Sequence, residues 1–262
     1  MPLPSGHQWE NTPPTVSNSY LPYLVIGSSN HAVGAQTTTA EVHYNTSRNF
    51  IYKHNDTIAG YADPPNNQSV STYSRLDESG TQNYTSFLSE MLREHTDKKV
   101  CAITAGQSAT GISNQITGYN SPTTLTQTTN LLNAAKAKTG ALKFACVGVS
   151  DGDMIFNQDA PTVTSLITSY IANLRTAAGN PNLPIMLICS GLVPPSHTAT
   201  YPSWTTNNDA MEIIDISGVY PIITDDMAVA TYRESDEVHR NAAGNLEVAD
   251  RIRDKLVLEG II

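Results

Sequence analysis

A serine near the start of the chain and an Asp-x-x-His pair near its end are the residues with the most direct chemical implication. Ser29 lies in Gly27-Ser-Ser-Asn30, directly after an apolar run. Asp236 and His239 stand just before the last helical pattern. A hydroxyl that attacks, an imidazole that takes its proton and a carboxylate that orients the imidazole are the groups that serine-dependent acyl transfer requires.

Each of these groups has a definite task in that chemistry. A serine hydroxyl is a weak nucleophile until a base removes its proton, and an imidazole with an ordinary pKa of about 6.5 can do so near neutral pH. Backbone N–H groups then stabilise the developing oxyanion, a contribution of roughly 3–4 kcal/mol per donor. We therefore predict Ser29 as nucleophile, His239 as general base and acid, and Asp236 as the carboxylate that orients His239.

The elements that must position these residues alternate between strands and helices. Near-continuous apolar runs, typical of strands buried on both faces, predict strands at Tyr23–Gly27, Val100–Thr104, Lys143–Val149, Ile185–Ser190 and Val219–Thr224. Helical spacing of apolar residues predicts helices at 83–95, 123–138, 161–178, 207–216 and 241–258. The alternation indicates an α/β fold, a doubly wound, flavodoxin-like three-layer sandwich whose parallel central sheet has about five strands.

The helix over 161–178 has the clearest signals. Asp159 can cap its start, Pro161 suits its first turn and Gly179 can end it. One apolar stripe along it consists of Val163, Leu166, Ile167, Tyr170, Ile171 and Leu174.

The length of 262 residues suits an N-terminal arm, residues 1–20, followed by a single domain, residues 21–262. The arm is rich in Pro, Ser and Asn. Residues 36–80 form a long polar excursion after the Ser29 motif, and loops of that size are usually functional. We expect this excursion to shape a substrate cleft.

The net charge of −9 and the absence of a Lys/Arg cluster argue against nucleic acid or an anionic membrane as a partner. No apolar run approaches the roughly 20 residues of a membrane span, and the N-terminus does not resemble a signal peptide. Charged residues make up only 15% of the chain, which is rich in Ser, Thr and Asn. This composition favours an extracellular or virion-associated protein.

The cysteines each lie within a predicted strand. Cys101, Cys146 and Cys189 are expected to be buried, inert thiols. Their odd number and the lack of a C-x-x-C spacing argue against a disulfide framework or a zinc site. We expect no metal and no cofactor.

Residues that follow parallel strands gather at one edge of a sheet, where ligands bind in folds of this class. Ser29 follows the first predicted strand, Gly106 the second, and Ser150 and Asp151 the third. The Asp236–His239 segment enters the last helix and can return to the same edge. We therefore expect these segments to form one surface.

Four segments, in the same order, resemble the motif blocks of the SGNH (GDSL-like) hydrolases. The resemblance is to the branch that includes sialate O-acetylesterases and acetyl xylan esterases. The segments are Gly27-Ser-Ser-Asn30 with Gly34, Val100-Cys-Ala-Ile-Thr-Ala-Gly106, Gly148-Val-Ser-Asp151, and Asp236-Glu-Val-His239.

The resemblance implies a metal-independent serine esterase that acts on an O-acetylated glycan or polysaccharide. It implies an oxyanion hole from the N–H groups of Ser29 and Gly106, with Ser150 as a third contributor. Asn30 and Asp151 are further candidates for substrate contact. His31 adjoins the Ser29 motif and could contact substrate, or it could serve a surface or capping role. Such an activity is compatible with a phage tail-associated deacetylase.

The sequence departs from that branch in the third block. Val147 and Val149 replace a glutamine and a glutamate, and the asparagine of more typical members is absent near Ser150. In the first block, Ser28 replaces a glutamine and one extra residue precedes Gly34. A catalytically inactive glycan-binding domain is therefore an alternative.

A second alternative uses a different serine. Gly148-Val-Ser-Asp-Gly152 matches the G-x-S-x-G nucleophile elbow of α/β-hydrolases, which would suit a lipase or thioesterase. The order would be Ser150, then Asp225, Asp226 or Asp236, then His239. Against it, no predicted helix follows directly and no His-Gly-Gly-Gly loop occurs upstream. A third serine, Ser108, is a weaker candidate, because it lies in the second block.

Aromatic residues near position 200 have two open interpretations. Trp204 and Tyr201 could stack on a sugar ring, or they could simply pack a loop.

Overall fold

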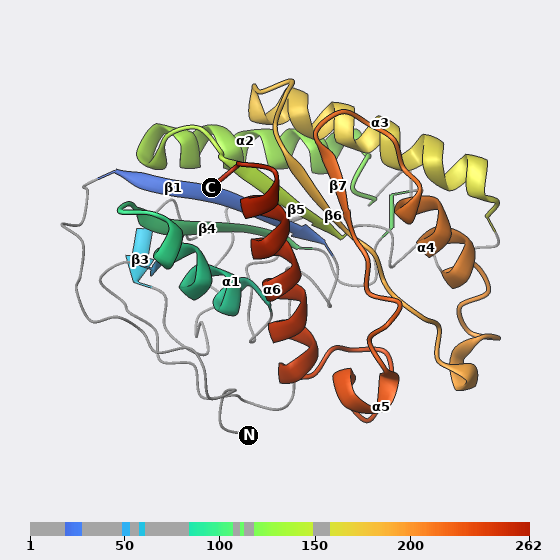
Figure 1. Cartoon of the computed structure of the whole chain (residues 1–262). Helices are drawn as coiled ribbons and strands as arrows, with labels where there is room; N and C mark the ends of the chain where they lie inside the picture. The colour runs from blue at the N-terminus through green and yellow to red at the C-terminus, as the bar shows by residue number, and fades with distance from the viewer. Residues whose placement is uncertain are drawn as a thin grey trace.

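A single sheet organises the fold. The computed structural model describes residues 19–27, 49–52, 58–60, 84–106, 111–112, 118–148 and 158–262. Within them, the strands are β1 (Tyr20–Gly27), β2 (Asn49–Tyr52), β3 (Ile58–Gly60), β4 (Lys99–Gly106), β5 (Phe144–Gly148), β6 (Ile185–Ile188) and β7 (Val219–Ile222). Their order across the sheet is β3-β2-β4-β1-β5-β6-β7 (Figure 1).

The five predicted strands are neighbours in this sheet, from β4 to the edge strand β7. Neighbours in the series β4-β1-β5-β6-β7 all pair in parallel. Numbered among themselves along the chain, they follow the order 2-1-3-4-5 of flavodoxin-like folds. The predicted fold class is therefore confirmed.

The polar excursion over residues 36–80 contributes two strands that were not predicted. β2 pairs in parallel with β4, and β3 pairs antiparallel with β2, so both extend the sheet beyond β4. Of the predicted N-terminal arm, residues 1–18 lie outside the described residues. Tyr20 already belongs to β1.

Helices cover both faces of the sheet. They are α1 (Tyr84–Leu92), α2 (Pro122–Thr139), α3 (Ala160–Ala178), α4 (Trp204–Glu212), α5 (Val229–Tyr232) and α6 (Ala242–Leu258), with short 3-10 helices η2 (Arg93–His95) and η4 (Pro195–His197). α2, α3 and α4 pack into one apolar cluster, whereas α1 and α6 pack into another on the opposite face (Figure 1). None of the helices in the described ranges is long and apolar enough to span a membrane.

Alternate residues of β1 divide between the two apolar clusters. Leu24 and Ile26 face α2 and α3, and Tyr23 and Val25 face α1 and α6. The three cysteines are free thiols buried in the same clusters, as predicted. Burial raises the pKa of Cys101 to about 12, so this thiol stays protonated and unreactive at neutral pH.

Helix α3 has the ends that its sequence predicts. The carboxylate of Asp159 accepts a hydrogen bond of 2.9 Å from the N–H of Thr162, and Gly179 adopts a left-handed φ of 63°. Its predicted stripe lies against α2, α4 and the sheet. Helix α4 runs over Trp204–Glu212 rather than over 207–216, because the N–H of Asn207 already donates to the carbonyl of Ser203 at 2.8 Å.

Candidate active site

Three neighbouring strands end at the same level of the sheet, each with a glycine. Gly27 of β1 is paired in register with Gly106 of β4 on one side and with Gly148 of β5 on the other. The three strands therefore end side by side at the carboxyl edge of the sheet. The first and third motif blocks begin at Gly27 and Gly148, and the second ends at Gly106.

Several predicted site residues follow these glycines in the sequence. They are outside the described residues, and their roles stay predictions: Ser29, Asn30, His31, Ser108, Ser150 and Asp151. Gly106 is the last residue of β4 rather than the first residue after it.

Asp236 and His239 form a hydrogen-bonded pair. Nδ1 of His239 lies 2.5 Å from Oδ2 of Asp236. The other carboxylate oxygen accepts from the backbone N–H groups of Val238 at 3.0 Å and His239 at 2.9 Å. With its Nδ1–H donated to the carboxylate, a neutral His239 ring presents Nε2 as its basic nitrogen. This is the tautomer that a general base acting on a serine hydroxyl needs.

The electrostatics of Asp236 agree with an orienting role. Burial acts to raise the pKa of Asp236, but the hydrogen bonds from the His239 ring and from the N–H groups of His239 and Val238 outweigh it, so that the net pKa is lowered. The carboxylate therefore stays ionised at neutral pH. Its contribution to stability is present above the ordinary pKa of an aspartate and is lost as the pH falls through the lowered value.

The turn that carries this pair is tightly closed. The N–H of Glu234 donates to the carbonyl of His239 at 2.7 Å, and the N–H of Glu237 donates to that of Glu234 at 2.9 Å. Glu237 has a φ of 58°, and it is the one non-glycine residue in the described ranges with a positive φ. Such a conformation is costly for a residue with a Cβ, so the surrounding hydrogen bonds must maintain it.

Two arginines fix the turn to the carboxyl end of β6. Arg233 donates from Nη2 to the carbonyl of Ser190 at 2.7 Å. Arg240, which is buried, donates from Nη2 to the carbonyl of Cys189 at 3.2 Å. Cys189 and Ser190 directly follow β6, which is separated from β1 by β5 alone. Two strand spacings amount to about 10 Å, so the turn and the end of β1 share one edge of the sheet.

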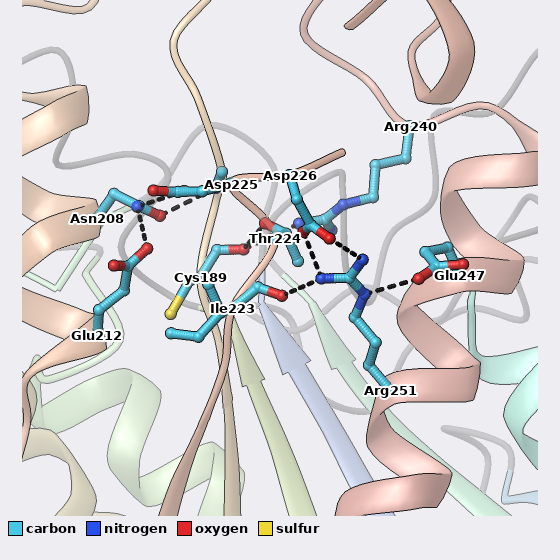
Figure 2. A network of polar contacts seen from close by, with 11 residues as sticks. Cys189, Asn208, Glu212, Ile223, Thr224, Asp225, Asp226, Arg240, Glu247 and Arg251 are labelled. Atoms are coloured by element: carbon cyan, nitrogen blue, oxygen red, sulfur yellow. Dashed lines mark hydrogen bonds and ion pairs between the residues drawn. The ribbon is translucent and has the colours of Figure 1, made fainter. Parts of the chain in front are cut away.

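The other two carboxylates considered as partners of His239 are engaged elsewhere. Asp225 accepts from Nδ2 of Asn208 at 2.8 Å, and Asp226 forms an ion pair with Arg251 at 2.6 Å (Figure 2). The suggestion that Asp225 or Asp226 orients His239 is therefore wrong. Of Asp225, Asp226 and Asp236, only Asp236 contacts the His239 ring. Asp225 points to the amide of Asn208, and Asp226 points to the guanidinium of Arg251.

Trp204 is placed for packing rather than for sugar contact. Its side chain is only 2% exposed, and its Nε1 donates to the carbonyl of Gly191 at 2.8 Å. The guanidinium of Arg233 lies over its ring, 5.3 Å from the centroid. The interpretation that Trp204 stacks on a sugar ring is therefore wrong, and the interpretation that it packs a loop is confirmed. Tyr201 contacts the rings of both Trp204 and His197.

Sequence reasoning missed three residues that contact the turn. Nε2 of His197 lies 2.9 Å from the carbonyl oxygen of Asp236. The hydroxyl of Ser196 donates to the carboxylate of Glu237, and Arg233 donates from Nη1 to the carbonyl of Val238. His197 is 39 residues from Asp236, and no spacing or composition signal links such distant positions.

A buried amide joins two further carboxylates at this edge. Nδ2 of Asn208 donates both to Asp225 and, at 2.6 Å, to Glu212 (Figure 2). Its Oδ1 accepts from the N–H of Gly191 at 2.9 Å. Burial, followed by the charge of Asp225, raises the pKa of Glu212 even though the Asn208 amide acts to lower it.

The fold of the chain is similar to that of several solved structures. No family model matches the chain, and neither does any curated protein sequence. Several solved structures match the chain in their fold. A protein from Arabidopsis thaliana superposes with a TM-score of 0.72 at 12% identity, over 92% of this chain and 99% of that one.

Two other matching structures carry a named activity. A carbohydrate acetylesterase from Xanthomonas citri gives a TM-score of 0.55 at 12% identity; the match covers 91% of this chain but 56% of that one. A lipase from a goat rumen metagenome gives 0.52 at 11% identity, over 89% and 96% of the two chains. Together with the strand order, these likenesses show that the chain has an SGNH/GDSL-like fold, as the motif blocks indicated.

Gly244 lies too close to a neighbouring backbone to accept a side chain without displacement. A Cβ at Gly244, in the first turn of α6, would lie 2.3 Å from the carbonyl oxygen of Tyr232. Helix propensity alone would make Gly244→Ala stabilising by up to about 1 kcal/mol. We expect instead a loss of about 1–3 kcal/mol, because overpacking must displace the start of α6 from α5. Urea denaturation measures this difference, and a rise in the free energy of unfolding would contradict it.

The raised pKa of Glu212 makes the stability of the protein depend on pH. A carboxyl whose pKa is higher in the folded protein binds more protons there, so its contribution to stability is present below the ordinary pKa and is lost as the pH rises through the raised value. In Glu212→Gln this loss is expected to disappear, which flattens the dependence of unfolding free energy on pH above about pH 4.5. Urea denaturation at several pH values tests it. Glu94→Gln, at an exposed position of η2, is the matched control and should keep the wild-type slope.

Proposed function

We propose that the protein is a serine esterase that removes O-acetyl groups from carbohydrate. The observation that carries this proposal is the Asp236–His239 pair, with 2.5 Å between Oδ2 and Nδ1, held at the sheet edge where β1 ends. In this proposal Ser29 attacks the acyl carbonyl and His239 takes its proton, then returns it to the leaving alcohol. Asp236 keeps the ring in the required tautomer.

The oxyanion would be stabilised at the same edge. The N–H groups of Ser29 and Gly106 are the proposed donors, and Ser150 is a third candidate. The support for this is the register of Gly27, Gly106 and Gly148, which starts all three segments from one level of the sheet. Donors fixed by a rigid sheet need no rearrangement when charge develops, which is what makes such stabilisation effective.

The proposal that the acyl group is acetyl and that the substrate is a carbohydrate is based on similarity to other proteins. The motif blocks resemble a branch of acetylesterases, and one structure with this fold is a carbohydrate acetylesterase. The proposed partner is an O-acetylated glycan or polysaccharide, and Asn30, His31 and Asp151 are proposed to contact it. A phage-tail deacetylase would use such an activity on a surface polysaccharide.

A lipase or thioesterase is the second candidate, since another structure with the same fold is a lipase. If Ser150 were its nucleophile, the G-x-S-x-G elbow should lead directly from strand to helix. In the sequence, Asp153-Met-Ile-Phe-Asn-Gln158 separates this elbow from the cap of α3 at Asp159. This spacing supports Ser29 over Ser150, and residues 149–157 themselves lie outside the described residues. Activity on long acyl chains without turnover of acetylated glycans would support the lipase, and glycan binding without turnover would support an inactive binding domain.

The nucleophile is tested by comparing Ser29→Ala and Ser150→Ala with wild type in the hydrolysis of p-nitrophenyl acetate. We expect Ser29→Ala to lower kcat on the order of 10³-fold or more, because the attacking oxygen is removed. Ser150→Ala should retain most of the activity, and circular dichroism should show that both variants are folded. Loss of activity confined to Ser150→Ala would replace Ser29 by Ser150.

The orienting acid is tested by Asp236→Asn. The asparagine amide keeps the size of the side chain, but it has no negative charge to hold His239 in the Nδ1–H tautomer. We therefore expect kcat to fall on the order of 10³-fold with a small change in KM. Asp226→Asn is the matched control, because Asp226 pairs with Arg251 instead. Equal effects of the two substitutions would argue against a specific role for Asp236.

A further inference from the structure

Arg233 contacts the His239 turn, the sheet edge and a buried aromatic ring at the same time. It directly follows α5, and its side chain is partly buried. Nη2 donates to the carbonyl of Ser190 at 2.7 Å, and Nη1 donates to the carbonyl of Val238. The guanidinium also lies over Trp204, 5.3 Å from the ring centroid. One rigid group thus connects the end of β6 with the residue that precedes His239.

The Val238 contact matters because that carbonyl and the N–H of His239 belong to the same peptide group. Arg233 holds the carbonyl side, and Oδ1 of Asp236 accepts from the N–H side at 2.9 Å. A peptide group is planar, so fixing both of its ends fixes the direction in which the Cα of His239 leaves it. Arg233 therefore constrains the backbone from which the His239 ring projects.

The surfaces that Arg233 uses are themselves fixed. Gly191 follows Ser190, and its carbonyl accepts from Nε1 of Trp204 at 2.8 Å, whereas its N–H donates to Asn208 at 2.9 Å. Gly191 has a φ of 78°, and a Cβ there would lie 2.8 Å from Oγ1 of Thr224. A side chain is excluded from this position, which lets the segment after β6 pack tightly against the end of β7. The guanidinium is therefore held against a rigid support.

We propose that Arg233 is a positioning residue for His239. This inference rests on the proposed function, in which His239 is the general base. A lysine would keep the charge, but it lacks the planar fork that reaches two carbonyls and stacks on a ring. The guanidinium is the group that satisfies all three contacts, so the proposal predicts that its shape matters as well as its charge.

Kinetics provide the first test. Arg233→Ala and Arg233→Lys should each lower kcat for p-nitrophenyl acetate about 10- to 100-fold with KM within about twofold, because a displaced base is less often aligned with the nucleophile. Low concentrations of guanidinium chloride, below those that unfold the protein, should restore part of the kcat of Arg233→Ala but not of Arg233→Lys. The matched control is Arg253→Ala. Arg253 pairs with Asp250 and Asp254 on the surface of α6, and its loss should leave kcat unchanged.

A spectroscopic test separates this inference from the proposed function. The proton between His239 Nδ1 and Asp236 should give a far-downfield proton resonance in the wild-type protein, assigned by its absence in Asp236→Asn. We expect it to broaden or vanish in Arg233→Ala and Arg233→Lys and to persist in Arg253→Ala. This readout requires no turnover, so it remains valid if the wild-type protein hydrolyses no ester.

The outcomes are distinct. An inactive wild-type protein whose resonance depends on Arg233 would defeat the esterase proposal but support the positioning role. Folded Arg233 variants with wild-type kcat and an unchanged resonance would overturn it. An Arg233→Lys variant equal to wild type in both measurements would also overturn it, because charge alone would then suffice. If Arg233→Ala fails to fold, Arg233→Lys with the resonance measurement decides between these outcomes.

Discussion

The parallel register of β4, β1 and β5 is the constraint on which the rest of the site depends. Since Gly27 stands opposite both Gly106 and Gly148, three strands that are far apart in the sequence end side by side at one edge of the sheet. Both faces of these strands are buried against helices, so a slip of one residue would exchange the side chains that pack into the two apolar clusters and disrupt both. The hydrophobic core thereby sets the positions at which the proposed chemistry takes place.

The core also explains how much the sequence could predict. Buried parallel strands and capped helices such as α3 are determined by local patterns, so their existence and order followed from apolar runs and from Asp159 and Gly179. β2 and β3 have only four and three residues, too few for an apolar run to identify them within a polar excursion. They are strands because β2 pairs with β4 and β3 pairs with β2. Arg233 and His197 could not be found either, because their roles arise from contacts with backbone carbonyls, which leave no trace in residue spacing.

The pKa values of two carboxylates at the same edge of the sheet shift in opposite directions because their surroundings differ. Asp236 receives hydrogen bonds from a histidine ring and two backbone N–H groups, and these lower its pKa in spite of burial. Glu212 receives one amide hydrogen from Asn208 while facing the charge of Asp225, so burial prevails and its pKa is raised. The carboxylate beside His239 is therefore kept ionised at neutral pH, as a group that supports an imidazolium must be, whereas the raised pKa belongs to a carboxyl that does not touch the histidine.

The Asp-x-x-His spacing has a physical reason within this turn. With two residues between them, Asp236 can accept the N–H groups of Val238 and His239 through one oxygen and the His239 ring through the other. The same carboxylate thus shapes the backbone and orients the side chain. The turn requires a left-handed residue at Glu237, and the cost of that conformation is offset by contacts from Ser196, His197 and Arg233. Loosening any of these would let the backbone relax at Glu237, so the precision of the His239 ring depends on residues well outside the four-residue motif.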